Sequence, residues 1–134
     1  AYLFGTFTAL NVIETNNSNP NVSSFFFTIL LFYLFFEVFF SFLRKLAQKK
    51  SPIKPDSEHL HMLSYKILNI KNPDRDCNYL NTLYLNLIYC LLVLPSILVR
   101  ENGMICKYWF FSLIIIYLLG YFRLNSFVKK KIDI

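Results

Sequence analysis

Apolar side chains along this chain fall into four uninterrupted blocks, at residues 1–13, 22–43, 79–99 and 104–122. As a helix, the block at 22–43 would measure about 33 Å, enough to cross a hydrocarbon core of about 30 Å. The next two blocks are of similar length, whereas 1–13 is shorter and is expected to be the outer part of a helix. No block alternates like a barrel strand, and backbone groups in lipid must be paired internally. The pattern therefore predicts an all-α, multi-pass transmembrane helical bundle with three full spans and one partial span.

Composition agrees with a membrane protein. Hydrophobic residues make up 55% of the chain and aromatic residues 19%, and a soluble domain with such blocks would expose large aggregation-prone patches. The three cysteines are odd in number and lack CxxC spacing, so we expect neither a disulfide framework nor a metal site in this chain. The first residue lies within an apolar stretch that lacks a charged signal-peptide region, so we expect the chain to be the carboxyl-terminal part of a longer protein.

The basic residues predict the orientation of the helices. Eight of the fourteen Lys and Arg residues fall in the segment 44–78, and four more fall in the tail 123–134, while the loop before residue 22 has none. Cytoplasmic loops carry an excess of Lys and Arg, so both basic segments are expected to be cytoplasmic. The net charge of +6 is explained by contact with anionic membrane lipid, and no nucleic-acid partner is expected, because no nucleic-acid-binding fold is recognisable.

Candidate chemistry gathers in the segment 44–78. A cationic collar stands where the span 22–43 ends, at the level of the lipid head groups, and could attract a phosphate or only anchor the helix in lipid. The planar fork of an arginine suits phosphate especially well. The collar consists of Arg44, Lys45, Lys49 and Lys50.

Two prolines shape the loop that follows the collar. Pro52 and Pro55 prevent the preceding helix from continuing and favour a defined turn. Asp56 is then expected to cap a new helix, with Glu58 in its first turn. Apolar residues at helical spacing continue to residue 70, which predicts an amphipathic helix lying on the membrane surface.

Three further ionisable residues suit an anionic substrate. His59 and His61 point the same way if the backbone there is extended, and nearly opposite ways if the helix has already begun. Imidazole can donate to or neutralise phosphate, although a surface pair or a partial metal site fits the same spacing. Glu37 is an acid inside an apolar run, which indicates a functional role, a neutral side chain, or a structural pairing with a base one or two turns on.

Together these residues resemble the cytoplasmic loop signature of the polyprenyl-phosphate N-acetylhexosamine-1-phosphate transferases. The matching elements, in the family's order, are Glu37, Arg44, Lys50-Ser51-Pro52, Pro55-Asp56 and His59-Leu60-His61. A weaker match is "AYLFG" at the start, which resembles the residues after the family's Gly-Asp-x-Gly motif. Met62 stands where the family usually has another histidine.

The resemblance implies a multi-pass enzyme of the bacterial inner membrane. Such an enzyme uses Mg²⁺ to transfer a sugar 1-phosphate, here GlcNAc 1-phosphate, from a UDP-sugar to undecaprenyl phosphate, and it releases UMP. A homo-oligomer is a separate expectation for this chain. His59 and His61 would lie near the donor's phosphates or sugar, the collar would receive phosphate, and Asp56 would orient the loop or a histidine. The family's aspartate motifs would lie upstream of Ala1, so the chain alone is expected to lack the metal ligands and activity.

Two other interpretations stay open. One is a noncatalytic multi-pass membrane protein, such as a transporter fragment or a scaffold subunit, which explains the helices and the charge distribution but leaves the ordered motifs to chance. The other is a metal-binding membrane sensor that uses His59 and His61, with or without Cys77.

Overall fold

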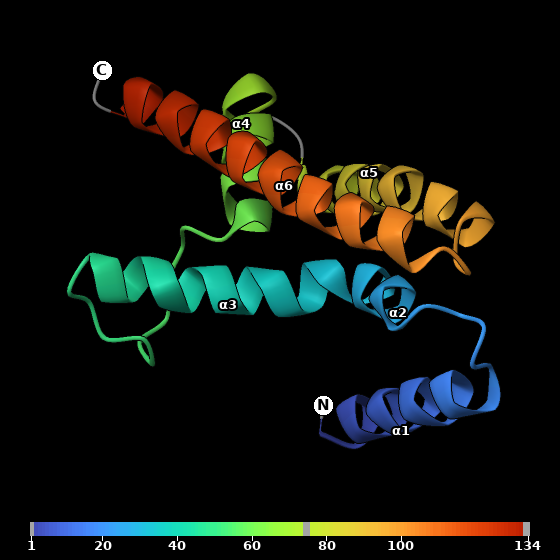
Figure 1. Ribbon diagram of the computed structural model, residues 1–134. Coiled ribbons are helices and arrows are strands. Elements are labelled where there is room, and N and C mark those ends of the chain that lie inside the picture. Colours follow the sequence, from blue (N-terminus) through green and yellow to red (C-terminus); the bar gives the residue numbers. More distant parts are fainter. Residues whose placement is uncertain (1, 74–75, 133–134) are drawn as a thin grey trace.

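The regular structure of the chain is entirely helical in the residues that the computed structural model describes, which are 2–73 and 76–132. Figure 1 shows that α6 lies close to α2 and the start of α3 and diverges from α3 toward the C-terminal ends of both helices, and that α4 crosses α6. The helices are α1 (Tyr2–Ser18), α2 (Ser24–Leu30), α3 (Phe32–Ala47), α4 (Leu60–Lys71), α5 (Asn78–Leu98) and α6 (Gly103–Ile132). The prediction of an all-α helical bundle is confirmed.

Two helices, α5 and α6, are long and apolar enough to cross a membrane, and α2 with α3 would make a third span if this bent pair is one span. These helices indicate a membrane protein. The prediction for 79–99 agrees with α5 to within one residue at each end. In contrast, α1 continues beyond the predicted end at residue 13 to Ser18, and it is not one of the candidate spans.

The residues predicted as one helical span, 22–43, form two helices, because the helix breaks at Leu31. The pair α2 and α3 is bent by 73°, and Leu31 has φ −105° and ψ 4°, outside helical values. The hydroxyl of Tyr89, from α5, donates to the carbonyl oxygens of Leu30 at 2.6 Å and Ile29 at 3.2 Å. A carbonyl freed by a helix break is costly in lipid, so this hydroxyl stabilises the break.

The residues predicted as a last span, 104–122, and most of those predicted as a basic cytoplasmic tail, 123–134, belong to one helix. The helix α6 continues without interruption to Ile132, and Lys129, Lys130 and Lys131 lie in its last turn, where positive charge is favourable. Residues 133–134 of the predicted tail, and Arg75 of the basic loop, lie outside the described residues. The basic end of α6 therefore extends helically beyond the apolar part.

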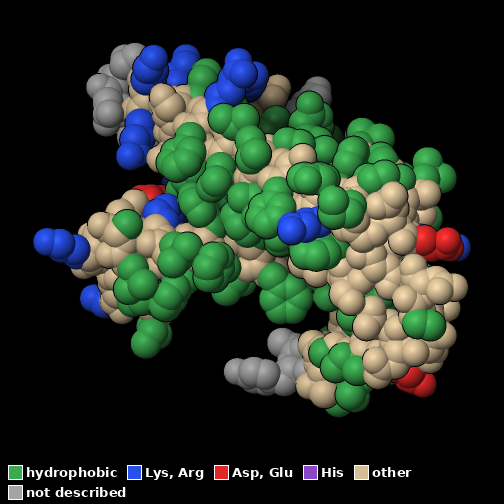
Figure 2. All heavy atoms as spheres, in the orientation of Figure 1, with side chains coloured by type: hydrophobic (Ala, Val, Ile, Leu, Met, Phe, Trp, Pro, Cys, Tyr) green, Lys and Arg blue, Asp and Glu red, His purple; other side chains and the backbone are tan. Residues whose placement is uncertain are grey.

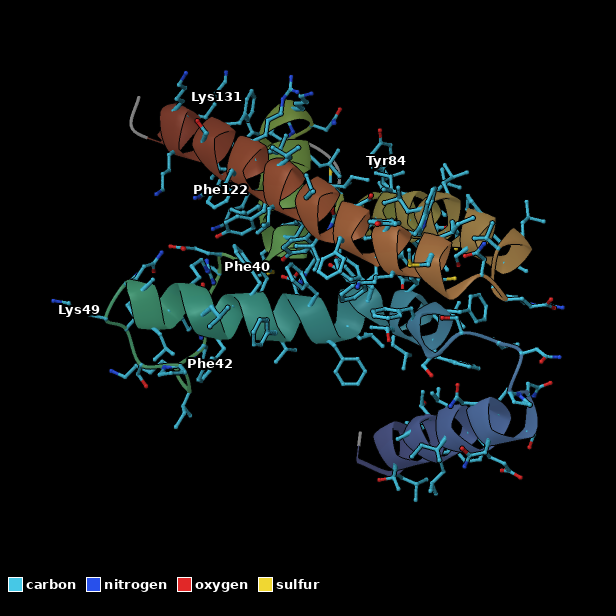
Figure 3. The ribbon with its side chains drawn as sticks, in the orientation of Figure 1. Phe40, Phe42, Lys49, Tyr84, Phe122 and Lys131 are labelled. Carbon is cyan, nitrogen blue, oxygen red and sulfur yellow. The ribbon has the colours of Figure 1, made fainter. Side chains whose placement is uncertain are left out.

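Aromatic side chains join α3 to α6. Phe36 packs edge-on against Tyr117 at 4.9 Å between ring centroids, and Phe40 packs against Tyr121 at 4.7 Å. In Figure 3, Phe40 lies on the side of α3 that faces α6, whereas Phe42 lies on the opposite side. The space-filling view shows extensive apolar surface on the outer faces of these helices (Figure 2), as expected for helices that contact lipid. These aromatic contacts fix the rotation of α3 about its axis, so that Glu37 and Arg44 also face α6.

Candidate functional site: the loop between α3 and α4

The loop turns back on α3 through a helix-ending motif. The amide of Lys50 donates to the carbonyl of Lys45 at 2.9 Å, and the amide of Lys49 donates to that of Leu46 at 3.0 Å. This is the Schellman arrangement, and its left-handed position, usually a glycine, is taken by Lys49 with φ 56°. The reversal returns residues 51–58 to the side of α3 and leaves Lys49 at its tip (Figure 3).

Arg44 connects the loop to both α3 and α6. One terminal nitrogen of its guanidinium donates to the Glu58 carboxylate at 2.6 Å and to the Tyr121 hydroxyl at 2.8 Å. The other forms an ion pair with Asp56 and donates to Ser41 Oγ at 3.3 Å. The Arg44 side chain is only 9% exposed. The loop's own carboxylates thus engage this guanidinium, and its contact with a substrate phosphate stays a prediction.

Asp56 closes a turn and does not cap α4 as expected. Its Oδ1 accepts the amide of Glu58 at 2.7 Å, whereas α4 begins at Leu60, so Glu58 lies before the helix and outside its first turn. Burial alone would raise the pKa of Asp56, but the Glu58 amide, Arg44, His59 and Lys45 outweigh that effect, and the pKa is held below its ordinary value of 3.8. The carboxylate form of Asp56 therefore stabilises the folded loop.

Acid should weaken the loop through Asp56. A carboxyl group whose pKa is lower in the folded state contributes stability above its unfolded pKa and loses it as the pH falls through the folded value. For the wild-type chain in detergent, we expect the temperature at the midpoint of unfolding to decrease as the pH is lowered below 3.8. Asp56→Asn should lower this temperature at neutral pH and make it depend less on pH in the acid range. Glu101→Gln, at an exposed position, is the control and should leave both unchanged. An equally steep acid loss in Asp56→Asn would contradict the assignment.

The lysines of the collar divide into one inward and two outward side chains. Lys45 is buried, and its Nζ donates to the carbonyls of Lys54 at 2.6 Å and Pro52 at 3.2 Å, which holds the proline turn. Lys50 is 61% exposed, with its Nζ 3.8 Å from the Glu58 carboxylate. Lys49 and Lys50 line a polar cavity of about 510 Å³ beside the loop. These two lysines are the members of the collar best placed to meet an anion from solvent.

Glu37 lies beneath the start of α4 and is buried. Its Oε1 accepts the backbone amide of Leu60 at 2.8 Å and lies 3.1 Å from His59 Nδ1, while its Oε2 accepts the Tyr117 hydroxyl at 2.6 Å. Of the alternatives for Glu37, pairing with a base one or two turns along α3 is not found, because the salt bridges within residues 2–73 and 76–132 pair Glu37 with His59. The acid joins α3, α4 and α6 at one point.

The two histidines point the same way. His59 has an extended backbone, with φ −67° and ψ 151°, and its ring stacks on that of His61 at 5.6 Å between centroids and 16° between planes. The carbonyl of His61 accepts the side-chain amide of Asn81 at 3.0 Å, which ties this turn to α5. Both imidazoles are thus presented together at the start of α4.

The apolar face of α4 packs on protein. Leu63 is 1% exposed, and Leu60 and Ile67 pack against the core formed with α6, whereas Ile70 is 41% exposed. The predicted amphipathic helix is present, but its partners are α5 and α6 and not the membrane surface alone. This docking places the histidine pair beside Glu37.

A metal centre does not assemble in the described part of the chain. No three His, Cys, Asp or Glu side chains there are grouped as metal ligands, and the Cys77 thiol is directed to the carbonyls of Leu68 at 3.6 Å and Asn72 at 3.8 Å. The sensor interpretation, with His59 and His61 and with or without Cys77, therefore gains no support from the described residues.

Two site residues escaped the sequence reasoning, namely Tyr117 and Tyr121 of α6. Both lie inside an apolar block, where hydropathy marks them only as part of a span. Their hydroxyls bond to Glu37 and Arg44. Tyrosines four residues apart on one helix face, opposite a helix with an acid and an arginine, are the signal that could have found them.

The fold and the site define a helical membrane protein with a histidine-bearing loop fixed against its helices. No known family model matches the chain, and neither does any curated protein or any solved structure.

Proposed function

We propose that the chain takes part in transferring an N-acetylhexosamine 1-phosphate from a UDP-sugar to undecaprenyl phosphate, with release of UMP. The observation that carries this proposal is the convergence of the motif residues. Glu37 contacts His59, 22 positions further along the chain, and Arg44 contacts Asp56, 12 positions further along. Ionisable side chains beside apolar helices tend to pair with one another, and here the paired residues are those of the family motif, which supports treating the motif as one site.

The chemistry suits the charges of the loop. Transfer joins two anions, so the site has to screen negative charge and hold the reactants in line. His59 and His61 would face the donor's phosphates, and Lys49 and Lys50 would attract the phosphate of the lipid acceptor. Arg44 and Asp56 would keep the loop in the conformation that presents these groups.

Magnesium does not fit the three carboxylates of the candidate site. Glu37, Asp56 and Glu58 all accept hydrogen bonds from amide, hydroxyl or guanidinium groups. The family resemblance assigns the metal ligands to upstream aspartates, and no step involving Mg²⁺ is derived from the residues described here.

The proposed location is the bacterial inner membrane, with the loop and the end of α6 in the cytoplasm. Most Lys and Arg side chains on the visible face gather at the end of the molecule where α3 and α6 finish (Figure 2). Figure 3 places Lys49 and Lys131 at this same end. Such clustering is typical of the cytoplasmic side, and it supports contact of this end with anionic lipid. Homo-oligomer formation stays a prediction.

The test is UMP release in membranes that contain the product of the complete reading frame, undecaprenyl phosphate, UDP-GlcNAc and Mg²⁺. We expect His59→Ala and His61→Ala each to lower turnover by about 100-fold, the range for a group that acts on the reacting phosphates. Asn69→Ala, an exposed position on the same helix, is the control and should retain activity. Unchanged turnover in both histidine variants would refute the site assignment, and no UMP release from the wild-type protein would favour the noncatalytic alternative.

A further inference from the structure

We propose that Glu37 is a positioning residue that holds His59 by its Nδ1, so that Nε2 is the ring nitrogen offered to the donor phosphate. This role rests on the proposed function, because the phosphate is its ligand. Glu37 itself would not touch the substrate, since it is buried at 7% exposure beneath the loop.

The contacts of Glu37 determine which nitrogen of His59 carries a proton. A carboxylate only accepts hydrogen bonds, and the Leu60 amide and the Tyr117 hydroxyl both donate to it. His59 Nδ1, 3.1 Å from Oε1, completes the set as a third donor. With Nδ1 held in this way, only Nε2 is left to meet a ligand.

Glu37 also fixes where α4 begins. His59 occupies the N-cap position, but its side chain makes no capping hydrogen bond. The first amide of the helix, that of Leu60, is accepted by Glu37 from the distant helix α3. Negative charge at a helix N-terminus is favourable, so one carboxylate sets both the start of the helix and the orientation of the ring next to it.

A purely structural explanation accounts less well for this acid. An ionisable side chain within an apolar helix is costly, and a lysine or arginine partner would be the simplest compensation. The nearby Arg44 is instead engaged by Asp56 and Glu58. The side-chain partners of Glu37 are a histidine that is 28% exposed and a buried tyrosine hydroxyl. The buried Glu37 is thus paired with the imidazole of His59, which is partly exposed to solvent.

His61 provides an internal reference for the experiment. It stacks on His59, and within residues 2–73 and 76–132 its ring has no carboxylate partner. The chain contains only these two histidines. A sample of the full 134-residue chain with ¹⁵N-labelled histidine therefore gives signals from these two rings alone, which His61→Gln assigns.

The test reads the protonation of each ring nitrogen by ¹⁵N NMR in lipid nanodiscs at alkaline pH. In the wild-type chain we expect a proton on Nδ1 of His59, while His61 shows the Nε2–H form that dominates free imidazole in water. In Glu37→Leu, the His59 signals should shift to match those of His61. Glu101→Leu, at an exposed carboxylate, is the matched control and should change nothing. A bare Nδ1 on His59 in the wild-type chain overturns the inference, whether or not the variant folds.

A kinetic measurement separates this inference from the proposed function. In the product of the complete reading frame, Glu37→Leu should lower kcat/KM for UDP-GlcNAc by about 10- to 100-fold, by analogy with the loss when the carboxylate that orients a metal-bound histidine is removed. Unchanged kcat/KM in an active protein overturns the positioning role. No UMP release from the wild-type protein, together with a protonated Nδ1 on His59, refutes the proposed function while upholding the hydrogen bond from His59 to Glu37.

Discussion

Replacement of Arg44 with methionine is expected to lower the free energy of unfolding by about 3 kcal/mol, because removal of one partner from a buried ion pair leaves the others uncompensated. Arg44 is 9% exposed and Asp56 12% exposed, and both Asp56 and Glu58 face the guanidinium. Methionine would leave two carboxylates close together without their shared cation. Reversible unfolding in mixed micelles, followed by helical circular dichroism, measures the loss.

Lys50→Met is the control for this prediction. The Lys50 ammonium is also close to Glu58, but it is 61% exposed, so its removal should change stability by no more than about 0.5 kcal/mol. Arg44→Lys should recover little, because a single ammonium cannot bond to both carboxylates and to Tyr121 as the planar fork does. Equal losses for the Arg44 and Lys50 variants would show that Arg44 is not the residue that holds the loop.

The helices with polar borders were predictable from the sequence. Helix α5 begins and ends close to the predicted limits, since polar residues flank its apolar run on both sides. The end of α6 was not predictable in this way, because hydropathy marks where a helix leaves lipid and not where it ends. No proline or glycine interrupts residues 123–132, so the helix continues through the basic residues.

The break at Leu31 had no local signal. The surrounding run, "FFFTILLFYLFF", contains neither proline nor glycine, which are the usual causes of a sharp bend. The Tyr89 hydroxyl that supports the break comes from α5, far along the chain. Interactions between distant segments of this kind cannot be deduced from local periodicity.

The candidate site was predictable in its members but not in its connections. The sequence identified the acid, the collar and the histidines, because ionisable residues beside or within apolar runs are conspicuous. It left the direction of the histidines open, since that depended on whether α4 begins before or after His59. It also missed Tyr117 and Tyr121, whose roles follow from the packing of α6 on α3.

Leu63→Ala is expected to destabilise the docking of α4 by about 3 kcal/mol, within the range for truncation of a buried leucine. Leu63 is 1% exposed and belongs to the apolar core shared with α6. Its truncation would leave a cavity under the helix that carries His61. Hydrogen exchange of the α4 amides in nanodiscs measures the local effect, and the ¹⁵N signal of His59 Nδ1 should move toward that of a free ring as the contact with Glu37 weakens.

Ile70→Ala is the matched control on the same helix, because Ile70 is 41% exposed. If α4 is held by α5 and α6, faster exchange should follow from the change at Leu63 and not from that at Ile70. If lipid contact held the helix, as the amphipathic pattern alone suggests, the more exposed Ile70 would matter at least as much. Equal effects at the two positions would therefore contradict the docking of α4 on protein, and with it the explanation of how the histidine pair is kept beside Glu37.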